Sequence, residues 1–134
     1  MTDEEWKKAR HIKKEDNWGD PGRISPVLVD ALYRLREAIG SSIFISKGTQ
    51  GEHVAGSQHS LGLAADCLFP DVSDLRDLYA IYRKACLIEE FKGMGIYPHW
   101  HYGSRIIGGM HLDVRNTQRR AMWMGVLDSK GVQQ

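Results

Sequence analysis

The sequence predicts an α+β domain in which helices flank a small antiparallel sheet. Two segments carry apolar residues at helical spacing, and four shorter apolar runs have the length of strands. These helices and strands do not alternate regularly along the chain, which favours the α+β class. With 134 residues and no internal repeat or linker, the chain is predicted to form a single domain over residues 1–134.

Two helices are predicted in the N-terminal part of the chain. Thr2 and Glu5 have the spacing of a capping box, which predicts a short helix over about residues 3–10. Ser25 precedes a proline, and this pair starts a helix because the hydroxyl caps it and proline has no N–H to leave unpaired. The second helix is expected to end at Gly40. Its apolar face consists of Leu28, Ala31, Leu32, Leu35 and Ile39.

The rest of the chain predicts short strands, loops and one more helix. Residues 11–23 are rich in turn-forming residues and are expected to be irregular. The polar segment 47–62 is predicted to be a loop, and a third helix is expected to begin near Ser73. The segment after Trp123 is ambiguous. The predicted strands cover residues 43–45, 63–69, 93–97 and 110–115.

The composition is typical of a soluble globular protein and argues against several function classes. Apolar residues make up 42% of the chain, and the mean hydropathy is −0.41. A net charge of +1 offers no general attraction to nucleic acid. Without a run of about 18 apolar residues no membrane insertion is expected, and the acidic N-terminus predicts no signal peptide. Cys67 and Cys86 are too few for a disulfide framework, and Cys67 is expected to be a core residue.

The most informative residues are a histidine and an aspartate that a turn and a strand bring together. His59 ends the polar loop, Gly62 permits a tight turn, and Asp66 lies on the strand that follows. An imidazole and a carboxylate held in this way supply two of the three protein ligands of a catalytic zinc site. His111, on a strand distant in the sequence, is well placed to supply the third.

One face of the predicted strand 110–115 presents three polar groups. Alternation places His111, Asp113 and Arg115 on the same face. This combination is costly to bury and more natural in the lining of a site. The opposite face is expected to point to the core and consists of Met110, Leu112 and Val114.

Two histidines and one aspartate around Zn²⁺ leave an open fourth position, where a water becomes acidic enough to attack a carbonyl near neutral pH. The constellation therefore predicts metal-assisted hydrolysis. The same residues also allow a reading without metal. In that alternative His59 is a loop histidine, and Asp66 is a turn residue or forms an ion pair with Arg115.

These residues resemble the zinc D-Ala-D-Ala carboxypeptidase and L-Ala-D-Glu endopeptidase family, part of a wider group that includes lysostaphin-type enzymes and the Hedgehog amino-terminal domain. The likeness covers about residues 11–123, the expected core of the domain, and is strongest to small phage and prophage members. The motifs that carry it are Ser57-x-His59-x-x-Gly62-x-Ala64-x-Asp66, Gly93-x-Gly95-x-Tyr97-Pro98, His111-x-Asp113-x-Arg115 and Arg120-Ala121-x-Trp123.

The resemblance implies a Hedgehog/DD-peptidase-like fold and a zinc ion held by His59, Asp66 and His111. It also implies an endolysin-like peptidase that acts on peptidoglycan stem peptides at a bond involving a D-amino acid. Peptidoglycan lies outside the cytoplasmic membrane, whereas the chain is expected to be made in the cytoplasm. Release with the lysis machinery of a phage is therefore the expected route to the cell wall.

The chain departs from the family at a substrate-binding arginine. Many members carry Ser-Gly-Tyr-Arg on the strand before the motif loop, whereas this chain reads Ser-Lys-Gly-Thr over residues 46–49. Lys47 and Arg115 are both candidates to replace the missing cation, although a lysine lacks the planar fork of arginine. Lys47 could equally be a solvated loop residue. His53, in the motif loop, is expected to have no specific role, and contact with substrate is its alternative.

The second departure concerns the general base. Larger members place a Glu or His two or three residues before the third zinc ligand, and here those positions are Gly108 and Gly109. Asp113 is a candidate base on the correct strand face, but it also fits the role of a carboxylate that orients a zinc-bound histidine. His101, in the loop after Pro98, is the second candidate, and its alternative is a surface residue without a chemical role.

The two departures support an alternative function. A zinc-binding but catalytically silent module, which binds a cell-wall peptide or a protein partner, would need neither the arginine nor the base. Turnover of peptidoglycan fragments distinguishes the two hypotheses.

Overall fold

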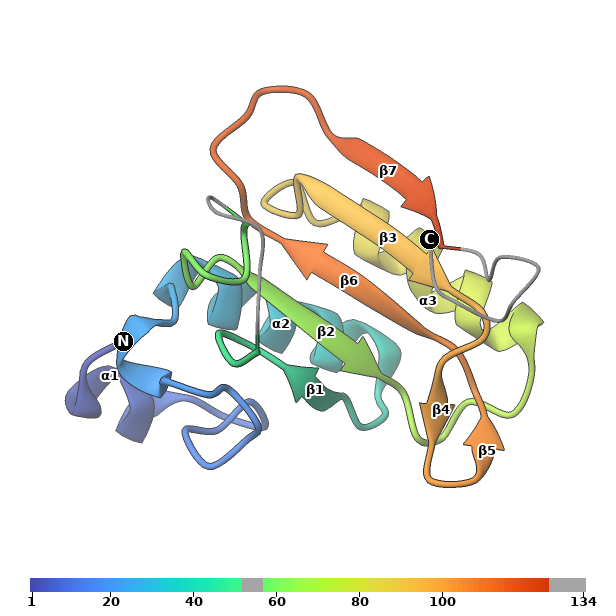
Figure 1. Cartoon of the computed structure of the whole chain (residues 1–134), viewed down its shortest axis with the longest axis horizontal. Coiled ribbons are helices and arrows are strands. Elements are labelled where there is room, and N and C mark those ends of the chain that lie inside the picture. The colour runs from blue at the N-terminus through green and yellow to red at the C-terminus, as the bar shows by residue number, and fades with distance from the viewer. Residues whose placement is uncertain (52–56, 126–134) are drawn as a thin grey trace.

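The computed structural model describes residues 1–51 and 57–125, in which a five-stranded sheet carries helices on one face (Figure 1). None of the helices in these ranges is long and apolar enough to cross a membrane. The helices are α1 (Asp3–Lys8), α2 (Pro26–Ile39) and α3 (Leu75–Cys86), with a 3₁₀ turn, η1, at Pro21–Arg23. The strands are β1 (Phe44–Lys47), β2 (Ala64–Leu68), β3 (Gly93–Tyr97), β4 (His101–Tyr102), β5 (Arg105–Ile106), β6 (Gly109–Asp113) and β7 (Ala121–Met124).

The α+β class and the three predicted helices are confirmed, and the helix ends follow local capping signals. The capping box of Thr2 and Glu5 is present, although α1 ends at Lys8, before the expected boundary. Ser25 caps α2 by accepting a hydrogen bond from a backbone N–H, and Gly40 ends it in the left-handed conformation at φ +67°. The helix α3 begins after Asp74, which caps it, slightly later than expected.

The sheet is mixed, so the prediction of a purely antiparallel sheet is wrong. Its order is β1-β2-β6-β3-β7, in which β7 pairs parallel to β3 and the other neighbours pair antiparallel. After β6 the chain crosses the end of β3 and returns on its far side, which forces the parallel pairing. A separate hairpin, β4–β5, forms within the segment predicted to be a loop.

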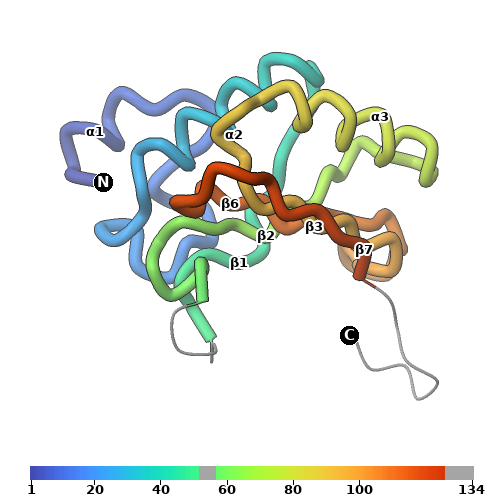
Figure 2. Tube along the Cα trace, turned by 90° about the horizontal axis from the view of Figure 1, so that it is seen from above, coloured from blue at the N-terminus to red at the C-terminus, as the bar shows by residue number. Residues whose placement is uncertain are grey.

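The described helices lie on one face of the sheet (Figure 2). Alternation along the strands turns apolar side chains toward the helices and leaves the other face open. As predicted, Cys67, Met110 and Leu112 are fully buried in the core. The same core cluster contains Ala65, Met94 and Ile96 of the central strands.

Candidate metal centre

A row of register partners crosses the open face of the sheet, and each strand contributes one residue. Asp66 of β2 pairs with His111 of β6, which pairs in turn with Gly95 of β3. Lys47 and Trp123 occupy the two ends of this row, on β1 and β7. Because register partners lie side by side, the sheet brings Asp66 and His111 together although they are far apart in the sequence.

His59 reaches this row from the turn before β2. The turn is closed by hydrogen bonds from the N–H of Gly62 to the carbonyl of His59, at 3.0 Å, and from Leu63 to Gln58, at 2.9 Å. Gly62 adopts φ +75° and packs against the carbonyl of Arg23, where a Cβ would overlap it. No other residue fits there without moving the chain. The glycine of the motif thus fixes the position from which His59 enters the site.

Three side-chain atoms from His59, Asp66 and His111 converge. The Nε2 atom of His59 lies 3.1 Å from Oδ1 of Asp66, and Nδ1 of His111 lies 3.3 Å from the same oxygen. The two ring nitrogens are 3.2 Å apart. Among the described residues this is the one group of three or more His, Cys, Asp or Glu side chains whose geometry could hold a metal ion.

Each histidine is oriented through its other ring nitrogen. The Nδ1 atom of His59 lies 2.9 Å from the carbonyl oxygen of Gly48, and Nε2 of His111 lies 2.6 Å from Oδ2 of Asp113. When the imidazole is neutral, an acceptor at the far nitrogen keeps the proton there, so that the near nitrogen can present a lone pair to a metal ion. Gly48, in the segment predicted to be a loop, therefore helps to orient His59 through its backbone carbonyl.

Asp113 is fully buried, and both of its oxygens are occupied. Oδ1 accepts hydrogen bonds from Nε and the backbone N–H of Arg115, at 2.8 and 3.1 Å. Oδ2 accepts from Nη2 of Arg115 at 2.7 Å and also contacts His111. Burial opposes ionisation, but Arg115 and His111 outweigh it and hold the pKa of Asp113 well below its ordinary value. The carboxylate thus stays charged and acts through His111.

Asp66 is also held in its charged form. Burial raises the pKa of this carboxyl, but hydrogen bonds from His111 and His59 outweigh burial and lower the pKa to about 2. For His111, burial lowers the pKa, and the hydrogen bonds to Asp113 and Asp66 raise it above its ordinary value of 6.5. The arrangement therefore concentrates negative charge around His111, which suits a cation in the space between the three ligand atoms.

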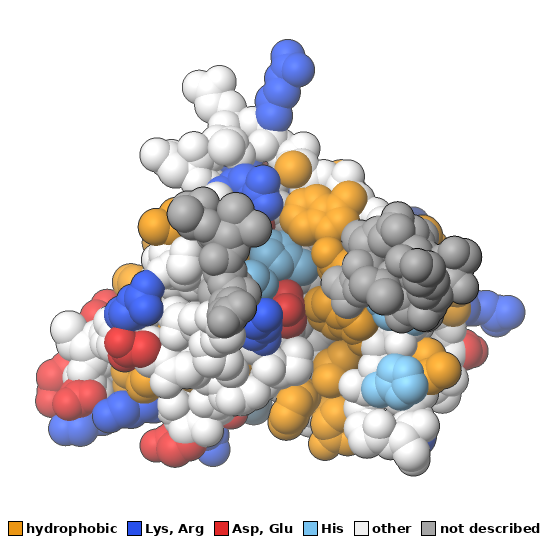
Figure 3. Space-filling model, in the orientation of Figure 1, with side chains coloured by type: hydrophobic (Ala, Val, Ile, Leu, Met, Phe, Trp, Pro, Cys, Tyr) orange, Lys and Arg blue, Asp and Glu red, His pale blue; other side chains and the backbone are white. Residues whose placement is uncertain are grey.

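The triad lies in the wall of an open cavity of about 460 Å³. Figure 3 shows histidine and acidic side chains together near the middle of this face, beside a strip of hydrophobic side chains. The residues that line the cavity are Ser57, Gln58, His59, Asp66, Tyr97, Trp100, His111, Arg115 and Trp123.

The other predicted site residues lie at different distances from this cavity. Arg115 lines it, with 25% of its side chain exposed, and pairs with Asp113 rather than with Asp66. Lys47 is the register partner of Asp66 but does not line the cavity. His101 has an exposed side chain on β4 and is also outside the lining. His53 lies outside the described residues.

Sequence reasoning missed the aromatic part of the wall, formed by Tyr97, Trp100 and Trp123. The indole of Trp123 lies over Gly95, where a Cβ would overlap it, and Asp113 fills the equivalent space over Gly93. The pattern Gly-x-Gly in β3 was the available signal. Two glycines at alternate positions leave two gaps on the same face of a sheet, and neighbouring side chains fill them.

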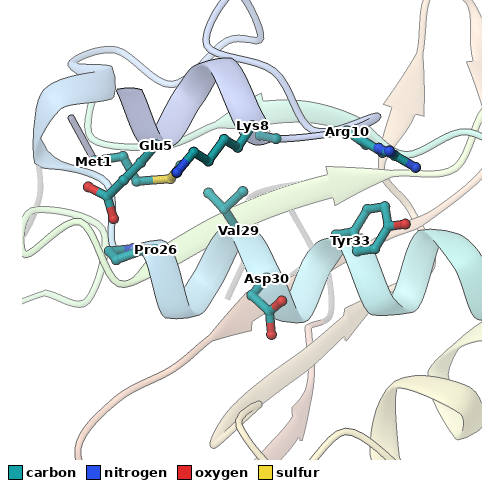
Figure 4. A pocket seen from close by; sticks show the side chains of 9 residues that line it. Met1, Glu5, Lys8, Arg10, Pro26, Val29, Asp30 and Tyr33 are labelled. Atoms are coloured by element: carbon teal, nitrogen blue, oxygen red, sulfur yellow. The ribbon is translucent and has the colours of Figure 1, made fainter. Parts of the chain in front are cut away.

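A second cavity, of about 420 Å³, lies on the helix side of the molecule between α1 and α2 (Figure 4). Val29 and Tyr33 of α2 and Lys8 of α1 point toward it. None of its lining residues belongs to the triad. The full lining is Met1, Glu5, Lys8, Ala9, Arg10, Pro26, Val29, Asp30 and Tyr33.

Comparison with protein-family models, with curated proteins and with solved structures finds no match to this chain.

Proposed function

We propose that this chain is a zinc-dependent peptidase of the peptidoglycan stem peptide. The observation that carries the proposal is the spacing of the triad. Zinc–ligand bonds of about 2.0–2.1 Å in a tetrahedron place the ligand atoms about 3.3–3.4 Å apart. The three distances in the triad are 3.1, 3.2 and 3.3 Å, so the side chains already stand at nearly the separation that zinc requires.

The donor set also fits zinc chemically. His59 would bind through Nε2, His111 through Nδ1 and Asp66 through Oδ1, and each imidazole has an acceptor at its second nitrogen. Imidazole and carboxylate ligands suit zinc, and three protein ligands leave one position for water or substrate. When bound, the ion would polarise a carbonyl and activate a water for its hydrolysis.

The substrate class rests on the sequence motifs. Ser57 to Asp66 and His111 to Arg115 resemble the zinc D-Ala-D-Ala carboxypeptidase and L-Ala-D-Glu endopeptidase family, and with them we infer its Hedgehog/DD-peptidase-like fold. The scissile bond would then involve a D-amino acid of a stem peptide. An endolysin-like role, with phage-type release to the cell wall, follows from the same resemblance.

One observation favours a second candidate, a zinc-binding module without turnover. Trp100 covers Gly109, where larger family members are expected to carry the general base. The candidate bases of this chain are also poorly placed for that task, because Asp113 is fully buried against Arg115 and His101 is outside the cavity lining. A module that only binds peptide needs no such group.

Metal analysis tests the first part of the proposal. The purified chain should hold about one zinc ion, and His59→Ala or His111→Ala should lose it because two ligands bind zinc weakly. His101→Ala is the matched control and should keep its zinc, because this exposed side chain lies outside the triad. Zinc that stays at the wild-type level in both triad variants would contradict the metal centre.

Digestion of purified peptidoglycan, followed by mass spectrometry of the released muropeptides, tests the second part. The zinc-loaded chain should release products cut at a bond next to a D-amino acid, and chelation should stop the release. Full zinc occupancy without any product over a panel of muropeptides would favour the binding module. Products that continue to form after the zinc has been removed would contradict the zinc mechanism.

A further inference from the structure

The positions two and three residues before His111, the proposed third ligand, are glycines and carry no side chain that could act in the cavity. Gly109 lies on the same face of β6 as His111, and a Cβ there would lie 2.7 Å from the ring of Trp100. Gly108 adopts φ +71° and packs against Leu78. A polar group that assists the reaction must therefore come from another part of the cavity wall.

Few polar side chains remain in that wall besides the triad: Ser57, Gln58, Tyr97 and Arg115. Arg115 directs Nε and Nη2 to Asp113. Gln58 has its side-chain oxygen buried away from solvent. Tyr97 differs from both, because it brings a hydroxyl from β3, the strand next to the one that carries His111.

The hydrogen bonding of Tyr97 leaves its proton available. Nε1 of Trp123 donates to the hydroxyl oxygen of Tyr97 at 2.8 Å. An indole N–H is only a donor, so the phenol is the acceptor in this bond and its own proton must point elsewhere. Within residues 1–51 and 57–125, no group accepts a hydrogen bond from this hydroxyl.

The position of the hydroxyl is fixed by packing. The ring of Tyr97 stacks on Trp100 with centroids 4.2 Å apart and an angle of 9° between the planes. Its edge fills the space over Gly125, where a Cβ would overlap it. Trp123, whose indole donates to this hydroxyl, also packs beside the triad, because the ring centroids of Trp123 and His111 are 5.2 Å apart. A hydrogen-bond donor held in this way needs no reorganisation during a reaction.

We propose that the Tyr97 hydroxyl donates a hydrogen bond to the carbonyl oxygen of the scissile bond as that oxygen gains negative charge. This inference rests on the proposed hydrolytic function. In the reaction the oxygen of a water adds to the carbonyl carbon, and the C–N bond breaks. One proton of the water ends on the departing nitrogen, and the other remains with the carboxyl product. Tyr97 keeps its own proton throughout and stabilises only the developing charge.

Steady-state kinetics of Tyr97→Phe on a soluble muropeptide test the proposal. Phenylalanine retains the ring that stacks on Trp100 and removes only the hydroxyl. Loss of one donor to an oxyanion should lower kcat about 10²–10³-fold. KM and zinc content should stay at the wild-type values, because the hydrogen bond strengthens only in the transition state.

Tyr102→Phe is the matched control. Tyr102 packs edge-on against Phe44, with centroids 5.3 Å apart, and does not line the cavity. Its variant should keep the wild-type kcat. Tyr97→Phe with a kcat within about twofold of wild type would overturn the inference while the peptidase proposal stands. A rise in KM alone, with kcat unchanged, would also overturn it, because it would show uniform substrate binding. A wild-type chain that binds zinc but turns over no muropeptide would instead overturn the proposed function and this inference with it.

Discussion

The carboxylate of Asp113 holds Nε2 of His111 at 2.6 Å and thereby turns Nδ1 of the same ring toward Asp66. Arg115 binds both oxygens of Asp113 from the opposite side. Three residues at alternate positions of one segment thus form a chain of contacts, from guanidinium to carboxylate to imidazole. Only the last of them belongs to the triad, so the first two can act on the candidate metal site only through His111.

Asp113→Asn should weaken zinc binding about 10–100-fold, the usual effect of losing a carboxylate behind a metal-bound histidine. The amide is a weaker acceptor for His111, and its NH₂ group would face the guanidinium of Arg115 or the ring nitrogen. A competition titration with a zinc chelator measures the change. Asp30→Asn is the control, because Asp30 is exposed on α2 and pairs with Arg34. Equal zinc affinity in the two variants would refute the orienting role of Asp113.

Gly93→Ala should disturb the same chain of contacts from the neighbouring strand. A Cβ at this position overlaps the carboxylate of Asp113, so the side chain must move. Overpacking of this kind costs about 1–3 kcal/mol in the free energy of unfolding. Zinc affinity should fall as well. Gly103→Ala, at φ +62° in the β4–β5 hairpin with open space around it, should lose stability through backbone strain but keep its zinc affinity.

The zinc-free protein should be most stable between about pH 4 and pH 6.5. The pKa of Asp66 is lowered from 3.8 to about 2, so its contribution is present above pH 3.8 and is lost as the pH falls toward 2. The pKa of Asp113 is lowered as well, so its contribution to stability is also lost at acidic pH. The pKa of His111 is raised above 6.5, so its contribution is present below pH 6.5 and is lost as the pH rises through the folded value.

Bound zinc should oppose the loss of stability above about pH 6.5. The ion needs neutral imidazoles, so its affinity rises as His111 loses its proton. Melting curves with chelator should therefore show Tm falling above about pH 6.5, and the Tm increase caused by zinc should grow over the same range. A zinc effect that shrinks toward alkaline pH would argue against His111 as a ligand.

Arg120 should be important for stability without any role in zinc binding. Its guanidinium donates to the carbonyls of Cys86, Ile88 and Phe91 at 2.7–2.8 Å, at the end of α3 and in the segment that follows it. A lysine ammonium cannot reach these three acceptors at once. Arg120→Lys should lose about 2 kcal/mol in urea unfolding, since hydrogen bonds to charged groups are worth about 1.5–3 kcal/mol. Arg119→Lys, at an exposed position, should change stability by less than about 0.5 kcal/mol.

Local signals predicted the helices and the inner strands well. Capping residues such as Ser25 and Gly40 act on the chain next to them, so their effect can be inferred without tertiary structure. The edge strand β7 and the β4–β5 hairpin were missed because short strands depend on their pairing partners more than on their own residues. The direction of β7 depends on how the chain passes the end of β3, which no local pattern encodes.

The triad was accessible from the sequence for a similar reason. The motif around His59 and the alternation in β6 are local, and together they select the residues that the sheet brings into contact. The roles of the residues around the triad could not be predicted from the sequence. Whether Asp113 acts as a base or as an orienting group depends on how Arg115 folds back on it. The aromatic wall depends on strand glycines that leave room for side chains from other segments.

The row of register partners across the sheet has a consequence for folding. A slip of one residue between β2 and β6 would turn His111 toward the helices and bring Met110 or Leu112 beside Asp66. A zinc ion would therefore bind only after the correct alignment has formed, and it would favour that alignment over any shifted one. Metal uptake during refolding should then report the moment at which the central strands lock into register.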